Sequence, residues 1–256
     1  MRLIIVSLNV GKLSAKSRAS GFFRWALENN ADVICIQSTG VHDAGYPQYA
    51  NLAGFRRFSD HHQTNGTTGV AIYTRANAGR EDINICDHEQ CRGRHIEVRL
   101  PSGLIIGSTY IRSGADWARQ EWKQNLRCVA ERMRVCADEP MIVTGDFNLA
   151  IEPIDLWPEN PKSQYGFMVP ERELFQELER VDGWIDSFRH MHPTTRSYTR
   201  WPNEESFPRK GWRLDYQWVS RCLAPALIRA EIAEPPTWEQ RFSDHAPMLT
   251  EYSFDG

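Results

Sequence analysis

The segment MIVTGDFN, residues 141–148, carries the clearest local indication of the fold. Its first half, Met141–Thr144, is a short apolar run of the kind that forms a strand buried between two layers. Polar groups follow at once, with Asp146 and Asn148 two residues apart. Loops that leave strand ends on one face of an open α/β sheet often carry the reactive side chains of such proteins. The segment therefore predicts a central strand with a candidate site at its carboxyl end.

Further strands are predicted on both sides of this segment by short runs of apolar, often β-branched residues. They are Leu3–Leu8, Val33–Ile36, Gly69–Tyr73, His95–Leu100, Leu104–Tyr110, Leu214–Val219 and Met248–Tyr252. Helices are predicted over Ser20–Asn29, Ala115–Cys136 and Pro170–Asp182. Strands and helices that alternate in this way favour an α/β protein whose mixed sheets are covered by helices.

The composition is that of an ordinary folded protein: 256 residues, 41% hydrophobic and 25% charged. This length suits one large domain, which we expect to span residues 1–256. No apolar run approaches the roughly 18 residues that a membrane span needs, and the N-terminal run reads as a strand, not as a signal peptide. A net charge of −3 neither indicates nor excludes nucleic-acid binding. We expect a cytoplasmic monomer that does not bind membranes.

The six cysteines are scattered along the chain. Cys86 and Cys91 flank His88, but no second Cys or His pair lies nearby at zinc spacing. Scattered reduced thiols of a cytosolic protein explain this pattern better than a metal site does.

Other polar clusters lie at strand ends. Asn9 follows the first strand, Ser38 follows the second, and Asp215 begins a strand within GWRLDY, residues 211–216. The motif SDHAP, residues 243–247, precedes the last strand and sets an Asp directly before a His. Carboxylates and amides in such positions hold a hard cation or orient a water, and a carboxylate can fix the tautomer of a neighbouring imidazole. Each cluster alone is equally compatible with turn chemistry, a core histidine or a structural ion pair.

In combination, these segments resemble the exonuclease III-like branch of the endonuclease/exonuclease/phosphatase superfamily. The likeness runs from Arg2 to Tyr252, and its most specific segments are GDFN, GWRLDY and SDHAP. The resemblance implies a four-layer α/β sandwich in which two mixed β-sheets pack face to face and are flanked by helices. It also implies a phosphodiesterase that depends on Mg²⁺ or Mn²⁺ and cleaves DNA at an abasic site or from a 3′ end. RNA is a further possible partner.

The resemblance also implies catalytic roles for individual residues. Asp146 would position or deprotonate the attacking water, and Asn148 would hold that water and a phosphate oxygen. His245 would stabilise the charge that develops on the phosphate, and Asp215 would orient it. Tyr110 would lie against the phosphate. Attack on a phosphodiester needs a polarised water on one side and charge relief on the other, which this set supplies.

The implied metal residues are Asn9, Asp244 and the residue at position 38, where the sequence departs from the family. Ser38 replaces a glutamate that binds the metal in relatives, and its neutral, shorter side chain should lower the affinity for a divalent ion. Three explanations compete: an engineered inactivation, a natural change compensated by water or Asp43, or a protein that only binds nucleic acid or a partner. A second departure at Gly40 favours natural divergence. The retained catalytic residues favour an active DNA-repair nuclease, with a binding regulator as the alternative.

For the substrate, the resemblance implies that Trp212 and Trp201 wall a pocket for a base-less sugar. Arg200 stands where relatives carry an aromatic residue, so it thins this pocket and adds a charge. Arg112 is expected to follow the nucleic-acid backbone, as guanidinium groups commonly do. For Arg200 the sequence does not decide between such a role and a solvated loop charge. The superfamily also cleaves lipid and nucleotide phosphoesters, but the sequence motifs of this chain favour the DNA-repair branch.

Overall fold

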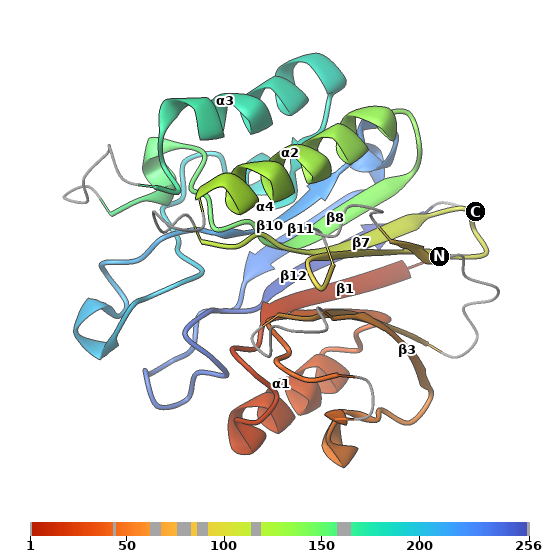
Figure 1. Ribbon diagram of the computed structural model, residues 1–256, viewed down its shortest axis with the longest axis vertical. Coiled ribbons are helices and arrows are strands. Elements are labelled where there is room, and N and C mark those ends of the chain that lie inside the picture. Colours follow the sequence, from red (N-terminus) through yellow and green to blue (C-terminus); the bar gives the residue numbers. More distant parts are fainter. Residues whose placement is uncertain are drawn as a thin grey trace.

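The computed structural model describes residues 2–42, 45–61, 68–75, 83–85, 92–113, 119–157 and 165–254. Within these residues the strands form two six-stranded sheets, which lie between helices (Figure 1). No helix of this part of the chain is long and apolar enough to cross a membrane. The predicted thiols at positions 86 and 91, with His88 between them, lie outside the described residues.

The first sheet has the strand order β11-β12-β1-β2-β4-β3. Its strands are β1 Arg2–Asn9, β2 Val33–Gln37, β3 Phe55–Asp60, β4 Val70–Arg75, β11 Leu227–Ile232 and β12 Met248–Ser253. Strands β1 and β2 are parallel, with Asn9 paired to Gln37, whereas the other neighbours are antiparallel. The sheet is therefore mixed, and the carboxyl ends of its two parallel strands meet at one edge.

The second sheet has the strand order β5-β6-β7-β8-β10-β9. Its strands are β5 Ile83–Ile85, β6 His95–Arg99, β7 Ile105–Tyr110, β8 Met141–Asp146, β9 Ile185–Asp186 and β10 Asp215–Val219. Only β7 and β8 are parallel. The predicted central strand is thus β8, and the GDFN motif begins within it and continues beyond its carboxyl end.

The two sheets pack face to face through apolar side chains that alternate along their strands. Ile5 and Ile72 of the first sheet share one buried cluster with Ile106 and Ile142 of the second. Helix α1, Lys16–Glu28, covers the outer face of the first sheet. Helices α2, Arg119–Val135, and α3, Val169–Glu177, cover the outer face of the second (Figure 1). The predicted four-layer α/β sandwich is confirmed.

Some helix bounds differ from those predicted. Helix α1 begins four residues early, at Lys16, because its buried face starts at Ala19 and continues through Phe22, Phe23 and Ala26. Helix α3 ends at Glu177 and continues as a π-helical turn, Leu178–Asp182, before Gly183 with a φ of 74°. The predicted start of the helix over Ala115–Cys136 lies outside the described residues. The structure adds helix α4, Ser187–Met191, and short 3-10 helices at Gln48–Ala50, Pro153–Asp155, Glu204–Ser206 and Arg221–Ala226.

A fully buried guanidinium stabilises the chain just before β10. Arg213 donates to both carboxylate oxygens of Asp155, at 2.8 and 2.9 Å, and its Nη2 lies 2.6 Å from Asp186. Arg189 also lies 2.6 Å from Asp155. These ion pairs connect the 3-10 turn, β9, α4 and the start of β10, so they hold the chain segment that carries Asp215.

Candidate active site

Strand register brings three predicted site residues side by side. At the end of β8, Asp146 lies opposite Tyr110 of β7 on one side and Asp215 of β10 on the other. The close approach of β7 requires a glycine before the aspartate, because a Cβ at Gly145 would lie 1.9 Å from the carbonyl oxygen of Thr109. Gly145 also has a φ of 137°, which is open to glycine and strained for other residues.

Asp146 is the centre of this cluster. Its carboxylate accepts hydrogen bonds from Nδ2 of Asn9 at 2.8 Å, from the backbone N–H of Asn148 at 2.9 Å and from Nδ2 of Asn148 at 3.1 Å. Burial raises the pKa of the Asp146 carboxyl to about 7, and the charge of Asp215 acts in the same direction. His245 and the hydrogen bonds oppose this shift. A carboxylate with such a pKa is suited to accept a proton near neutral pH.

Asn148 is held in position by its backbone and by its side chain. Its φ of 49° lies in the left-handed region, which asparagine tolerates better than most residues. Its Nδ2 donates to the carbonyl oxygen of Ile111 at 2.7 Å as well as to Asp146. The Asn148 amide is therefore fixed between the Asp146 carboxylate and Ile111, the residue that follows β7.

His245 forms a buried dyad with Asp215. Its Nδ1 lies 2.7 Å from Oδ2 of Asp215, and its Nε2 lies 3.9 Å from Oδ2 of Asp146. Burial alone would lower the pKa of His245, but the carboxylates of Asp215 and Asp146 outweigh it and raise the pKa to about 9. The imidazole is therefore protonated at neutral pH, and Nε2 is the nitrogen left to face a substrate.

Two hydroxyl groups that sequence reasoning did not assign to the site support this dyad. The Oγ of Ser243 donates to the carbonyl oxygen of Asn9 at 2.6 Å and accepts from the backbone N–H of His245 at 2.9 Å. The Oγ1 of Thr199 accepts from the backbone N–H of Asp215 at 3.1 Å. The first lies within SDHAP, so that motif already carried a signal for it; nothing local to Thr199 indicates its role.

Ser38 lies beside Tyr110. Its hydroxyl is hydrogen-bonded to the phenol of Tyr110, and its φ of 57° is left-handed. Arg94, which is also buried, places its guanidinium carbon 4.9 Å from the centre of the Tyr110 ring. Burial and the charge of Asp146 raise the pKa of the phenol, while Arg94 and Ser38 oppose the shift. Arg94 is a neighbour that sequence reasoning missed, because no local motif marks it.

The three predicted metal residues each contact other groups of the protein. Both ends of the Asn9 amide are engaged, since Nδ2 donates to Asp146 and Oδ1 accepts from the backbone N–H of Gly11 at 3.0 Å. Ser38 is bonded to a phenol. The Asp244 side chain is 44% exposed and lies 3.6 Å from Nε of Arg200. Asp43, considered as a compensating ligand, lies outside the described residues.

A candidate acidic metal site is instead formed by Asp146, Asp215 and His245, whose ligand atoms all lie within 4.8 Å of one another. Among the described residues, Oδ1 of Asp215 has no hydrogen-bond partner although it is buried. A buried carboxylate oxygen without a partner is costly, and a cation would relieve it. The two carboxylates are hard oxygen donors of the kind that divalent ions accept, whereas the protonated imidazole of His245 adds no ligand. These residues therefore fit a divalent cation held by the two carboxylates.

The predicted substrate residues differ in how far they are exposed. Trp212 is half-buried, and its ring packs next to Gly166. Trp201 is only 1% exposed, and its Nε1 donates to the carbonyl oxygen of Pro208 at 3.0 Å. Its ring is turned into the protein and is not open to a ligand. Arg112 is half-buried two residues beyond Tyr110.

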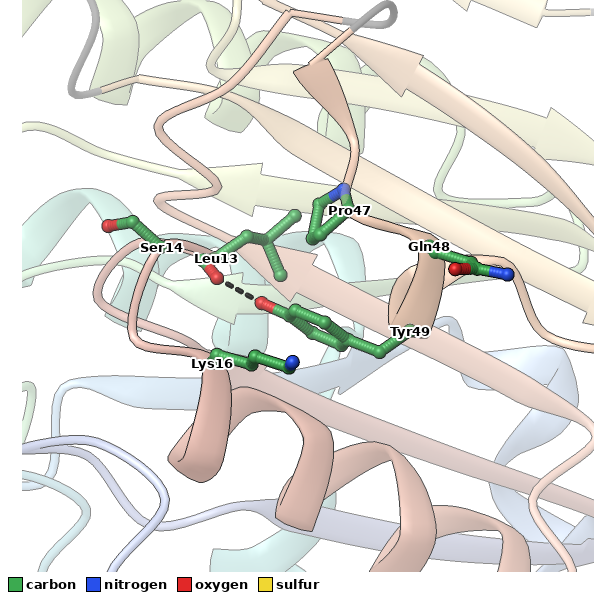
Figure 2. A pocket seen from close by; sticks show the side chains of 6 residues that line it. All are labelled: Leu13, Ser14, Lys16, Pro47, Gln48 and Tyr49. Carbon is green, nitrogen blue, oxygen red and sulfur yellow. Dashed lines mark hydrogen bonds between the residues drawn. The ribbon is translucent and has the colours of Figure 1, made fainter.

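A cavity of about 480 Å³ lies beside the loop that follows β1 and was not predicted (Figure 2). Its lining residues are Leu13, Ser14, Lys16, Pro47, Gln48 and Tyr49. The Tyr49 hydroxyl donates to the carbonyl oxygen of Leu13, which fixes the ring as one wall (Figure 2). The backbone N–H groups of Lys12 and Leu13 donate to the carbonyl oxygens of Ser38 and Thr39, at 2.8 and 2.9 Å. The cavity therefore lies on the loop that is paired with the Ser38 segment.

The class that this fold and site define is the Endonuclease/Exonuclease/phosphatase family. The model of that family matches residues 6–245, and the chain belongs to it. An exodeoxyribonuclease of Bacillus subtilis is 28% identical over 95% of this chain and 97% of its own length. A DNA-(apurinic or apyrimidinic site) endonuclease of Dictyostelium discoideum is 30% identical over 95% of this chain and 69% of its own length. Among solved structures, a 3′ phosphatase from Neisseria bound to product DNA hairpin is similar, with a TM-score of 0.84, 25% identity, and coverage of 98% of this chain and 100% of that one.

Proposed function

We propose that this protein is a single-domain, divalent-metal-dependent phosphodiesterase that acts on DNA in repair, at abasic sites or from 3′ ends. The observation that carries the proposal is the buried cluster in which Asp146, with Asn148, faces the Asp215–His245 dyad. Such a cluster places a proton acceptor and a protonated imidazole on one site, as hydrolysis of a phosphodiester requires. Relatives named as an exodeoxyribonuclease and an apurinic or apyrimidinic site endonuclease support DNA as the substrate. We further propose that the protein is a cytoplasmic monomer.

In the proposed mechanism, Asp146 accepts a proton from the attacking water. Asn148 orients that water and a phosphate oxygen, because its amide is fixed on Asp146 and Ile111. His245 donates from Nε2 to the phosphate, and Asp215 keeps the ring in that orientation. A bound Mg²⁺ or Mn²⁺, held by the carboxylates of Asp146 and Asp215, would polarise the phosphate and make the attacking water more acidic. The assembled cluster gives no support to the alternative of a regulator without catalysis.

Activity should follow a bell-shaped dependence on pH. The rate rises as pH increases through the pKa of Asp146, because the base must be ionised; this pKa is about 7 before a cation binds and is lowered by the charge of the cation. The rate falls above the pKa of His245, about 9, because the imidazole must be protonated. Asn9→Ala removes a hydrogen bond that lowers the pKa of Asp146 and should therefore move the rising limb to higher pH. The measurement is kcat against pH at saturating metal. A variant whose rising limb stays in place or moves to lower pH would contradict this assignment.

The function is tested with an abasic duplex and a 3′-recessed duplex, each titrated with Mg²⁺ and Mn²⁺. Cleavage of either substrate by the wild-type chain is expected. Ser38→Glu should lower the half-saturating metal concentration by about tenfold, because it adds a carboxylate next to the candidate site. Ser38→Gln is the matched control, since it has the same length and no charge. If no concentration of either ion supports cleavage by the wild-type chain and Ser38→Glu restores it, the chain is not active as it stands.

A further inference from the structure

Backbone pairing places Arg200 between two residues of the site. It lies directly opposite Trp212 on one side and directly opposite His245 on the other, in two antiparallel bridges. The backbone N–H groups of Arg200 and Trp212 donate to each other's carbonyl oxygens at 2.9 Å. Side chains that lie directly opposite in antiparallel pairs share one face. Trp212, Arg200 and His245 therefore lie on the same face, with Arg200 as the middle residue of the three.

The neighbours of Arg200 along the chain have the opposite orientation. Thr199 is fully buried and Trp201 is 1% exposed, whereas the Arg200 side chain is 36% exposed. Side chains in an extended segment alternate between the two faces. This alternation directs Thr199 and Trp201 into the protein and Arg200 towards the face of His245. The guanidinium is thus a group that a substrate at His245 would meet.

The guanidinium is only loosely engaged within the protein. Its Nε lies 3.6 Å from Oδ2 of Asp244, which is an ion-pair contact too long for a hydrogen bond. Among the residues that the structure describes, the Arg200 side chain has no hydrogen bond. Arg213, by comparison, makes two hydrogen bonds to Asp155 at 2.8 and 2.9 Å. The N–H groups of Arg200 therefore remain as donors for a ligand, and Asp244 restrains the side chain near the site.

The chemistry of a guanidinium decides between the possible ligands. Planar N–H donors bind phosphate oxygens through charge-assisted hydrogen bonds, frequently in pairs. A base-less sugar is neutral, so contact with it would remove water from the guanidinium without supplying a charged partner. Of the two tryptophans predicted to wall a sugar pocket, Trp212 is half-buried opposite Arg200, whereas the Trp201 ring is buried. A phosphate at a strand end carries a charge of about −1.5 to −2 at pH 7, against −1 for a phosphate within the chain.

We propose that Arg200 is a phosphate-binding residue that makes the enzyme prefer a DNA strand end carrying a 3′-phosphate over a base-less sugar within a strand. This inference rests on the proposed function, since it names the substrate of the same site. In the reaction, the water oxygen bonds to phosphorus and the bond from phosphorus to the 3′-oxygen breaks. Asp146 takes up one proton from the water, and the leaving 3′-oxygen takes up one proton, so the number of protons balances. The products are a 3′-hydroxyl and inorganic phosphate.

Binding without turnover tests the role of Arg200 itself. In excess chelator, fluorescence anisotropy would compare three duplexes that differ only in one feature: a recessed 3′-phosphate, a recessed 3′-hydroxyl, or an internal tetrahydrofuran abasic analogue. The wild-type chain should bind the 3′-phosphate end about tenfold more tightly than the other two, which is the size of one charge-assisted interaction. Arg200→Gln should abolish this preference, and Arg200→Lys should retain part of it.

The matched control is Arg229→Gln, which removes an exposed guanidinium that is also paired with one carboxylate, Glu231. This variant should keep the full preference. An unchanged preference in Arg200→Gln, or tighter wild-type binding of the abasic analogue, would overturn the inference. The thermal unfolding of each variant would show whether the variant is folded at the temperature of the binding measurement.

Turnover separates this inference from the proposed function. With Mn²⁺, the release of phosphate from the 3′-phosphate end and the cleavage of an abasic duplex would both be followed. If the wild-type chain cleaves neither substrate but its binding preference depends on Arg200, the proposed function fails and the phosphate-binding role stands. If both substrates are cleaved and Arg200→Gln slows them equally, the proposed function stands and the role of Arg200 in selection fails.

Discussion

Asp146→Asn should reduce kcat on a cleavable DNA duplex by about 10³-fold while the folded structure is kept, a loss within the range for removal of a general base. Asparagine has the shape of aspartate, but its single amide oxygen can replace only one of the two carboxylate oxygens, of which Oδ2 accepts from Nδ2 of Asn9 and Oδ1 from the backbone N–H of Asn148. It cannot take a proton from water. Single-turnover rates at saturating metal would measure the loss. Asp138→Asn, which changes an aspartate whose side chain is 91% exposed, is the control and should leave the rate unchanged.

The same substitution should raise stability at alkaline pH. A carboxyl whose pKa is raised by folding binds its proton more tightly in the native state, so the native state loses stability as pH rises from the unfolded pKa towards about 7. Asparagine removes this loss. A gain of ~1 kcal/mol would raise the Tm by about 2–4 °C for a chain of this size. A variant that lost activity and also melted earlier at pH 8 would indicate a structural role for Asp146 instead.

Arg213→Met should destabilise the fold by about 3–5 kcal/mol, the usual cost of leaving a buried charge without its partner. The Arg213 and Asp155 side chains are both fully buried, and Asp186 is 4% exposed, so water cannot replace the lost guanidinium. The free energy of unfolding in urea is the measurement. Arg221→Met is the matched control, because the Arg221 and Asp138 side chains are 65% and 91% exposed and their ion pair should contribute under about 1 kcal/mol.

A double variant tests whether this effect arises from charge. Adding Asp155→Asn to Arg213→Met removes one of the two stranded carboxylates, so it should recover part of the stability that the single variant lost. Equal stability of Arg213→Met and the control would show that the buried ion pairs do not hold the segment before β10.

The strands that were predicted from the sequence and those that were not occupy different places in the sheets. Every predicted strand is internal to its sheet, and the four that were missed, β3, β5, β9 and β11, are the edge strands. An internal strand is buried on both faces and reads as an apolar run. An edge strand has one open side, as in β3, where Arg56 is exposed beside the half-buried Phe55. Its pattern is weak until a neighbouring strand is present to pair with it.

The candidate site divides in a similar way. The motifs GDFN, GWRLDY and SDHAP indicated four site residues: Asp146, Asn148, Asp215 and His245. The structure brings all four together around the carboxyl end of β8. These sequence motifs did not predict which contacts the neighbouring residues make. The Ser38 hydroxyl contacts Tyr110, and the Asp244 carboxylate lies beside Arg200. These contacts join residues far apart in the chain, and no local pattern encodes them.

By itself, the sequence determined the internal strands, because burial leaves local apolar patterns. Its resemblance to the family implied the layer order and the four central residues of the site. Only the tertiary structure decided which face each side chain meets. The buried ion pairs of Arg213, the orientation of Trp201 into the core and the place of Arg200 beside His245 all depend on chain crossings and strand register. Register places residues opposite one another whatever their separation in sequence, and that is why the selectivity proposed for Arg200 became visible only in the folded chain.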